Sequence, residues 1–183
     1  VESAGYSSVL IDGAWTDLIA GHDAAFSFTA AEASAAAPAV ISLTSGTTGR
    51  PIGIVLDHER MLLRSLTDLS ARYGGMLLNP LPLSFSASRS HTFSALLLGT
   101  AVLFFPVLFS AEELAEGIRA GAGSVCTVPT MVRKLLEIAS SDQAPAFDHL
   151  AAFYCLGAPM LAEEKLQAKA VLSSNFVQEY GSV

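Results

Sequence analysis

The sequence predicts an α/β fold in which a mostly parallel sheet is flanked by helices. Short apolar segments alternate along the chain with segments of helical pattern, as in strand–helix–strand units. The apolar segments are nearly continuous instead of alternating with polar residues, which indicates strands buried on both faces. Mean hydropathy is accordingly high, at +0.48, although polar or charged residues interrupt every apolar run before it reaches the length of a membrane-spanning helix.

The first expected elements lie on either side of a polar segment. Residues 40–43 and 52–56 are apolar and predict two short strands. Asp57 can cap the N-terminus of a helix that runs to about Tyr73. The apolar face of this helix is predicted to contain Met61, Leu62, Leu66 and Leu69.

The central elements continue the alternation. Residues 76–78 and 101–105 predict strands. Residues 90–98 lie between them, are apolar on most sides, and predict a buried helix. In such a sheet, ligands bind in the loops beyond the carboxyl ends of the strands.

The last third of the chain carries the clearest helix signals. Ser110 and Glu113 have the spacing of a capping box, which predicts a helix to about residue 120. Pro129 predicts the start of another helix, which ends near residue 139. The remaining elements are expected as strands at 124–128, 153–156 and 176–180 and as a helix at 161–171.

Charge and cysteine content exclude several classes of protein. The net charge is −7 and the ten basic residues form no patch, which argues against nucleic acid and anionic membrane surfaces as partners. Cys126 and Cys155 lie in apolar segments without a Cys or His at ligand spacing, so neither a disulfide framework nor a zinc site is expected. Buried free thiols favour a reducing, cytoplasmic location, and no signal peptide is visible.

The N-terminal part differs in composition from the rest. Residues 24–39 are rich in Ala and Ser and are interpreted as a linker or surface loop. We therefore expect an N-terminal segment at 1–39 and a domain at 40–183. Because the chain begins with Val1 and stops after a strand-like run, it is expected to be a fragment of a larger domain.

The most informative segment is the polar loop "LTSGTTGRPIG" at residues 43–53. Its glycines let the backbone turn, so that N–H groups and side-chain hydroxyls can surround a phosphate. It is not the common P-loop, because no Gly-Lys-Ser/Thr follows. On composition alone, a polar hairpin turn between the strands at 40–43 and 52–56 is the alternative.

The order of residues in this loop resembles the signature phosphate loop of the adenylate-forming superfamily, which includes acyl- and aryl-CoA ligases, luciferases and the adenylation domains of peptide synthetases. Four later segments resemble family segments in the same order: "LPLSFSASRSHTFSALLLGTAVLFF", "VCTVPTMVRKLL", "FYCLGAPMLAEEKLQ" and "VQEYGSV". The resemblance implies that the chain is part of the large N-terminal domain of such an enzyme.

The resemblance implies ATP-dependent activation of a carboxylic acid to an acyl-adenylate, with release of pyrophosphate and usually transfer to coenzyme A. The implied cofactors are ATP, Mg²⁺ and coenzyme A, or the phosphopantetheine of a carrier protein. Two alternatives stay open: a stand-alone adenylation enzyme that loads a carrier protein, and a non-catalytic nucleotide-binding remnant.

The resemblance also assigns residues, with no metal ligand among them. It implies phosphate contacts from Thr44, Ser45, Gly46, Thr47, Thr48 and Gly49; an adenine side formed by Gly157, Ala158, Pro159, Tyr180 and Gly181; and an acid pocket bordered by Phe85 and His91. For His91 the alternative is packing within a helix. The catalytic residues of the family are expected beyond Val183.

Two positions depart from the family pattern. Ile52 stands where the family has Lys, and Val183 stands where it has the Thr of Tyr-Gly-x-Thr-Glu. Each departure removes a polar contact to phosphate, and a charge-assisted contact is worth about 1.5–3 kcal/mol. The pairs Glu112-Glu113 and Glu163-Glu164 are expected in first helical turns, where carboxylates favour the helix dipole, and not as catalytic pairs.

Overall fold

The computed structural model describes residues 20, 34–44, 52–67, 73–106, 108–139 and 145–181. The chain divides into two units, residues 1–33 and residues 34–183. Every helix and strand named below belongs to the second unit.

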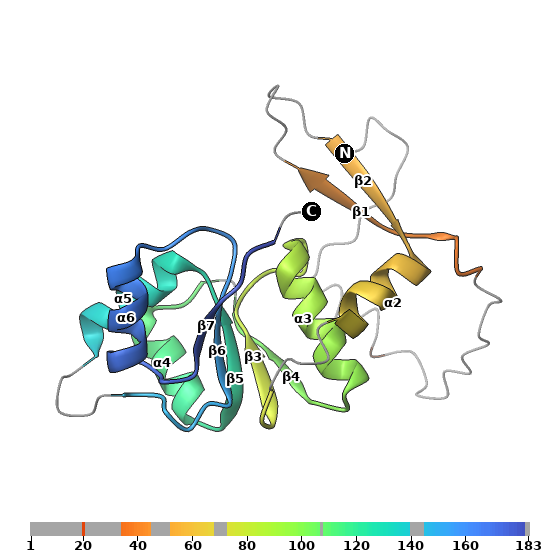
Figure 1. Cartoon of the computed structure of the whole chain (residues 1–183). Coiled ribbons are helices and arrows are strands. Elements are labelled where there is room, and N and C mark those ends of the chain that lie inside the picture. The colour runs from red at the N-terminus through yellow and green to blue at the C-terminus, as the bar shows by residue number, and fades with distance from the viewer. Residues whose placement is uncertain are drawn as a thin grey trace. The chain divides into compact units, whose positions relative to one another are not determined.

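A five-stranded parallel sheet forms the centre of this unit, with the order β4-β3-β5-β6-β7 (Figure 1). Its strands are β3 (Met76–Asn79), β4 (Val102–Phe104), β5 (Ala122–Thr127), β6 (Ala152–Cys155) and β7 (Phe176–Gln178). The predicted fold class is thereby confirmed, and each strand overlaps the segment expected for it.

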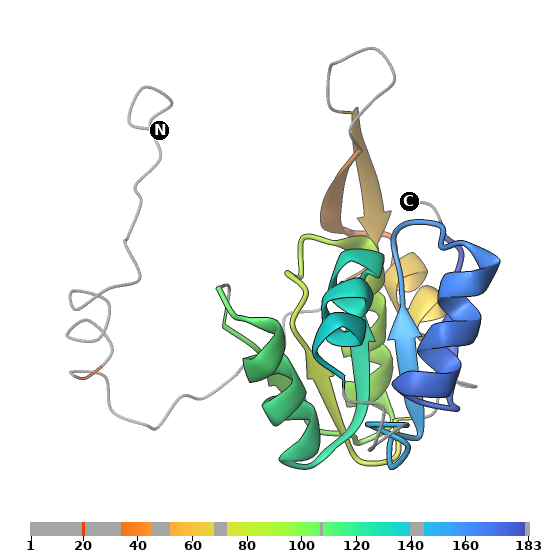
Figure 2. The same cartoon turned by 90° about the vertical axis from the view of Figure 1, so that its left-hand side faces the viewer.

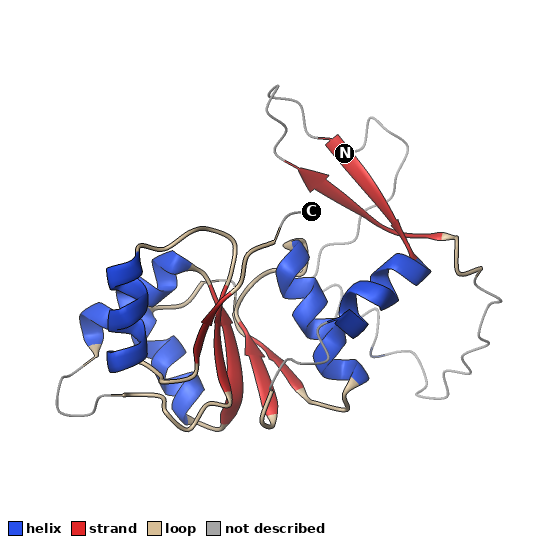
Figure 3. Cartoon of the chain, viewed as in Figure 1, coloured by secondary structure: helices blue, strands red, loops and turns tan. Residues whose placement is uncertain are grey.

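Helices cover both faces of the sheet, as Figures 2 and 3 show. One face carries α4 (Ala111–Arg119), α5 (Pro129–Ile138) and α6 (Ala162–Val171). The other carries α3 (Ser86–Leu97), and α2 (His58–Thr67) packs against α3. Within the described ranges, none of the helices combines the length and the apolar character needed to cross a membrane.

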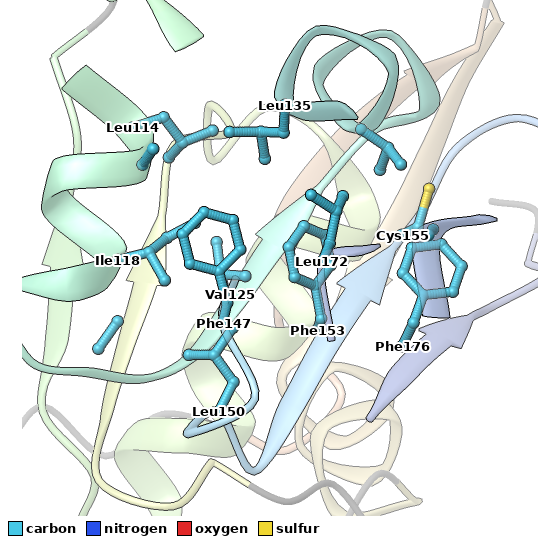
Figure 4. Close-up of a cluster of buried hydrophobic side chains, with 14 of the residues drawn as sticks. Leu114, Ile118, Val125, Leu135, Phe147, Leu150, Phe153, Cys155, Leu172 and Phe176 are labelled. Carbon is cyan, nitrogen blue, oxygen red and sulfur yellow. The ribbon is translucent and has the colours of Figure 1, made fainter. Parts of the chain in front are cut away.

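Among the described residues, the core consists of two apolar clusters, one on each face of the sheet. Neighbouring residues of one strand point to opposite clusters, because side chains alternate along a strand. Val125 and Phe153 belong to the cluster under α4, α5 and α6, which Figure 4 shows. Cys126 and Tyr154 belong to the cluster on the α3 side. This arrangement explains why the strands lack polar alternation.

The first two strands form a separate antiparallel hairpin, β1 (Pro38–Thr44) and β2 (Ile52–Asp57). The expectation that β1 is a buried strand is wrong, since Ile41 and Leu43 are 65% and 71% exposed. Ser42, between them, is only 4% exposed. The strand therefore turns its polar residue inward and its apolar residues outward within the described part of the chain.

Helix α2 begins as predicted, with Asp57 Oδ1 accepting a hydrogen bond from the Arg60 N–H at 2.7 Å. Its predicted apolar face is wrong, because Leu62 and Leu66 are 48% and 36% exposed while Ser65 is buried. Leu69 lies outside the described residues. The capping box of α4 is confirmed, since the Ser110 and Glu113 side chains each accept from the other residue's backbone N–H.

Helix α3 inverts the sequence-based expectation of an apolar buried helix. Apart from Ala95, its buried side chains are polar: Ser88, Arg89, His91, Thr92 and Ser94. Phe93, Leu96 and Leu97 are 39%, 54% and 50% exposed. The physical reason is a set of fixed polar partners beneath the helix. Asn79 Nδ2 donates to Ser88 Oγ and to Thr92 Oγ1, each at 2.9 Å.

We predict that Asn79→Ala lowers the free energy of unfolding by about 2–4 kcal/mol, because it leaves buried hydroxyls and the Leu81 N–H without this partner. Urea unfolding followed by circular dichroism measures this change. The control is Gln167→Ala on the exposed side of α6, which should change stability by no more than about 0.5 kcal/mol. Equal stability of the two variants would show that the buried network contributes little.

Candidate functional site

The loops after β6 and β7 meet at the carboxyl edge of the sheet. The Glu179 N–H donates to the Cys155 carbonyl at 3.0 Å, and Gln178 Nε2 donates to the Ala158 carbonyl at 2.9 Å. Between them lies a cavity of about 520 Å³, whose lining is Gly157, Ala158, Pro159, Lys165, Lys169, Phe176, Gln178, Glu179, Tyr180 and Gly181. All five residues expected on the adenine side thus line one cavity.

A second cavity of about 170 Å³ adjoins the first. The two share Gly157, Glu179, Tyr180 and Gly181. Its other lining residues are Arg64, Phe85, Ser86, Ala87, Ser90 and Leu156. Phe85, expected at the acid pocket, therefore lines the cavity that adjoins the one lined by the residues expected around adenine.

Gly157 lets the two cavities come this close. Its φ is +89°, a region that favours glycine, and a Cβ at this position would meet Cζ of Phe85 at 2.8 Å. The phenyl ring therefore packs directly on the backbone of the shared wall. A side chain at position 157 would displace it.

His91 is placed behind this wall and is not among the residues that line either cavity. It is 1% exposed. Nδ1 lies 3.1 Å from the Tyr73 hydroxyl and Nε2 lies 2.9 Å from Glu179 Oε2. The ring also packs on Tyr154, with 4.6 Å between centroids.

Several polar residues of the site were missed by the sequence reasoning. Glu179 lines both cavities, and its position directly before Tyr180 in "EYG" was the available signal. Lys165 and Lys169 on α6, and Arg64 on α2, had no signal, because their roles depend on how the helices pack. Arg89 donates to Ser42 Oγ at 2.6 Å, and its burial, together with the charge of Arg64, lowers its pKa.

The predicted phosphate loop lies mostly outside the described residues, which include only Leu43, Thr44, Ile52 and Gly53 at its ends. Thr44 and Ile52 are register partners in the β1–β2 hairpin, as are Leu43 and Gly53. The loop therefore connects adjacent antiparallel strands, as the hairpin alternative expected, and its phosphate contacts stay a prediction. Ile52 is 57% exposed.

Other candidates have structural roles. Cys126 and Cys155 are both buried, as expected. Glu164 accepts from Arg133 Nε at 2.6 Å, and this hydrogen bond lowers the pKa of the Glu164 carboxyl. In the part of the chain that the structure describes, no three His, Cys, Asp or Glu residues gather as a metal cage would require.

Comparison with known proteins identifies the class of this parallel α/β domain. A model of the AMP-binding enzyme family matches residues 4–182, so the chain belongs to this family. It is also 34% identical, over 113 residues, to a peroxisomal butyrate–CoA ligase of Arabidopsis thaliana. That match covers 59% of this chain and 19% of the ligase.

Solved structures agree in fold. Apo MatB from Rhodopseudomonas palustris superposes with a TM-score of 0.74 at 26% identity, over 92% of this chain and 33% of MatB. MatB solved with ATP bound gives a TM-score of 0.68 at 27% identity, over 86% of this chain and 32% of MatB. The N-terminal domain of FACL13 from Mycobacterium tuberculosis, at 22% identity, gives a TM-score of 0.77 over 93% of this chain and 43% of that chain. The chain thus spans about a fifth of the curated relative and about a third of MatB.

We predict that Gly157→Ala destabilises the protein more than Gly99→Ala. Both glycines have left-handed φ values, +89° and +71°, but a Cβ at Gly99 meets nothing within 4 Å. Gly99→Ala should cost about 1–2 kcal/mol from backbone strain alone, and displacement of the Phe85 ring should add about 1–3 kcal/mol at Gly157. Urea midpoints measure both, and equal losses would mean that the contact with Phe85 is unimportant.

A second prediction concerns thiol reactivity. Burial raises the pKa of Cys155 to about 11 from 9.0, so its thiolate fraction at pH 8 falls by about a hundredfold. Native protein should therefore react with iodoacetamide at Cys155 at least about a hundred times more slowly than protein unfolded in urea. Mass spectrometry of labelled peptides measures the ratio. Fast labelling of native Cys155 would contradict its burial.

Proposed function

We propose that this chain forms part of an enzyme that activates a carboxylic acid as its adenylate. The observation that carries the proposal is the pair of adjoining cavities that share the wall formed by Gly157, Glu179, Tyr180 and Gly181. Adenylation requires a carboxylate beside the α-phosphate of a nucleotide, and two neighbouring pockets with one common wall suit that requirement.

The larger cavity suits the nucleotide. Tyr180 and Gly157 to Pro159 would flank adenine, and the exposed ring of Tyr180 offers a face for stacking. Gln178 supports this fit, because its Oε1 is a buried acceptor without a hydrogen-bond partner among the described residues. This oxygen can accept a hydrogen bond from an N–H of the base.

The smaller cavity suits the acid, with Phe85 as an apolar border. The hydroxyls and N–H groups of the loop from Thr44 to Gly49 would hold the β- and γ-phosphates. Mg²⁺ would be held largely by phosphate oxygens, where it neutralises charge, as is usual for nucleotide sites without a protein cage.

In the proposed reaction, a carboxylate oxygen attacks the α-phosphorus of ATP. A bond forms between that oxygen and phosphorus, the bond from phosphorus to the α–β bridging oxygen breaks, and pyrophosphate leaves with the electron pair. Attack by a thiol, of coenzyme A or of carrier-protein phosphopantetheine, on the acyl carbon would then release AMP. The residues that line the two cavities contribute by positioning both reactants.

The test is carboxylate-dependent exchange of labelled pyrophosphate into ATP, with the longest natural product of the gene and a panel of fatty and aromatic acids. We expect exchange with one class of acid. Absence of exchange with every acid of the panel, from folded protein, would overturn the proposal for that panel and favour a nucleotide-binding remnant.

We further predict that Ile52→Lys raises the exchange rate at low ATP about tenfold or more, because it restores a charge-assisted phosphate contact worth about 1.5–3 kcal/mol. Ile52 is exposed at the start of β2, so a longer side chain fits without repacking. Ile52→Gln, which lengthens the side chain without adding charge, is the matched control and should not raise the exchange rate comparably. Equal rates for the two variants would show that no phosphate lies within reach of position 52.

A further inference from the structure

The buried His91 connects helix α3 to the wall between the two cavities. A neutral imidazole has one N–H donor and one acceptor nitrogen. The tautomer with its proton on Nε2 fits both contacts: Nε2–H then donates to Glu179 Oε2 over 2.9 Å, and Nδ1 accepts from the Tyr73 hydroxyl over 3.1 Å. Because the ring is 1% exposed and packs on Tyr154, it has little freedom to turn.

Glu179 is held at two points. Its backbone N–H donates to the Cys155 carbonyl, which continues the pairing of β7 with β6. Its carboxylate is bound through Oε2 by His91, so this oxygen points into the protein, and the side chain as a whole stays 33% exposed. Tyr180 and Gly181 follow directly, and all three residues line both cavities.

A carboxylate at this position poses an electrostatic problem for the proposed function. The two cavities would receive two anions, a nucleotide and a carboxylate, and a third negative charge on their common wall would repel both. A hydrogen bond from a buried donor draws the carboxylate away from the cavities and disperses its charge. The geometry therefore gives His91 a second role besides helix packing, which is to hold the Glu179 carboxylate away from the cavities.

We propose that His91 is a positioning residue that restrains the Glu179 carboxylate against α3, and thereby keeps the shared wall open to two anionic reactants. The expected effect on the binding of two anions rests on the proposed function. The restraint of Glu179 by His91 rests on the observed contacts alone. It does not make His91 a catalytic residue, since the imidazole lines neither cavity.

The test uses kinetics of pyrophosphate exchange with the full-length gene product. His91→Leu should raise KM for both ATP and acid by about tenfold, with a smaller change in kcat, because Glu179 is then free to turn toward the cavities. The double variant His91→Leu with Glu179→Gln should recover most of this loss, since it removes the unrestrained charge. His91→Gln, whose amide can still donate to Glu179, should lie between wild type and His91→Leu.

The matched control is Ser94→Ala. Ser94 lies one turn further along α3, is fully buried, and donates to the Ser65 carbonyl at 2.7 Å, but it touches neither cavity. It should lower stability while leaving both KM values unchanged. If His91→Leu behaves in the same way, or if Glu179→Gln fails to rescue it, the positioning role is overturned.

A second measurement separates this inference from the proposed function and does not depend on His91→Leu folding. Nitrogen NMR of full-length protein with labelled histidine should show His91 with Nε2 protonated and Nδ1 unprotonated. Glu179→Gln should shift the Nε2 resonance, and Ser94→Ala should not. Absence of exchange in wild type, together with this NMR signature, would overturn the proposed function and leave the restraint of Glu179 intact. Absence of a proton on Nε2, or an Nε2 resonance that does not respond to Glu179→Gln, would overturn the restraint itself.

Discussion

The hydrogen bonds on the buried face of α3 determine where the other parts of the site lie. Asn79 ties this helix to the end of β3, Arg89 ties it to β1, and His91 ties it to the segment after β7. One helix thus holds the hairpin that carries the polar loop and one wall of the cavities. Buried polar groups must be paired, so the position of α3 follows from its partners.

This constraint explains the unusual distribution of side chains. An apolar underside could slide or rotate on the sheet at modest cost, because apolar contacts have no direction. A polar underside has few acceptable positions, since each donor needs its acceptor at about 3 Å. The leucines of α3 consequently face outward within the described part of the chain, where Leu96 is 54% exposed.

Local signals in the sequence were sufficient for most of the fold. The capping box at Ser110 and the proline at position 129 depend only on neighbouring residues, and both helices begin where predicted. The orientation of α3 was not predictable in this way. Ser42, which accepts from Arg89, and Glu179, which binds His91, lie 47 and 88 residues away from them, and the sequence offers no local trace of such pairs. Glu179 had one local signal, its position directly before Tyr180, but its contact with His91 depends on the folded chain.

The distribution of charge at the cavities follows from the same arrangement. The proposed function requires local cations in a chain with a net charge of −7. The polar loop contains Arg50, which lies outside the described residues, and Ile52 where the family pattern has Lys. Among the described residues, the cations that line the cavities come from helices: Lys165 and Lys169 from α6, and Arg64 from α2. Glu179 is the one acidic residue among the described residues that line them, and it is the one whose carboxylate is held by a buried imidazole. Cations face the space that anions would occupy, while the carboxylate is drawn toward the protein interior, so the electrostatics of the site depend on the packing of α3 as much as on the loops that line it.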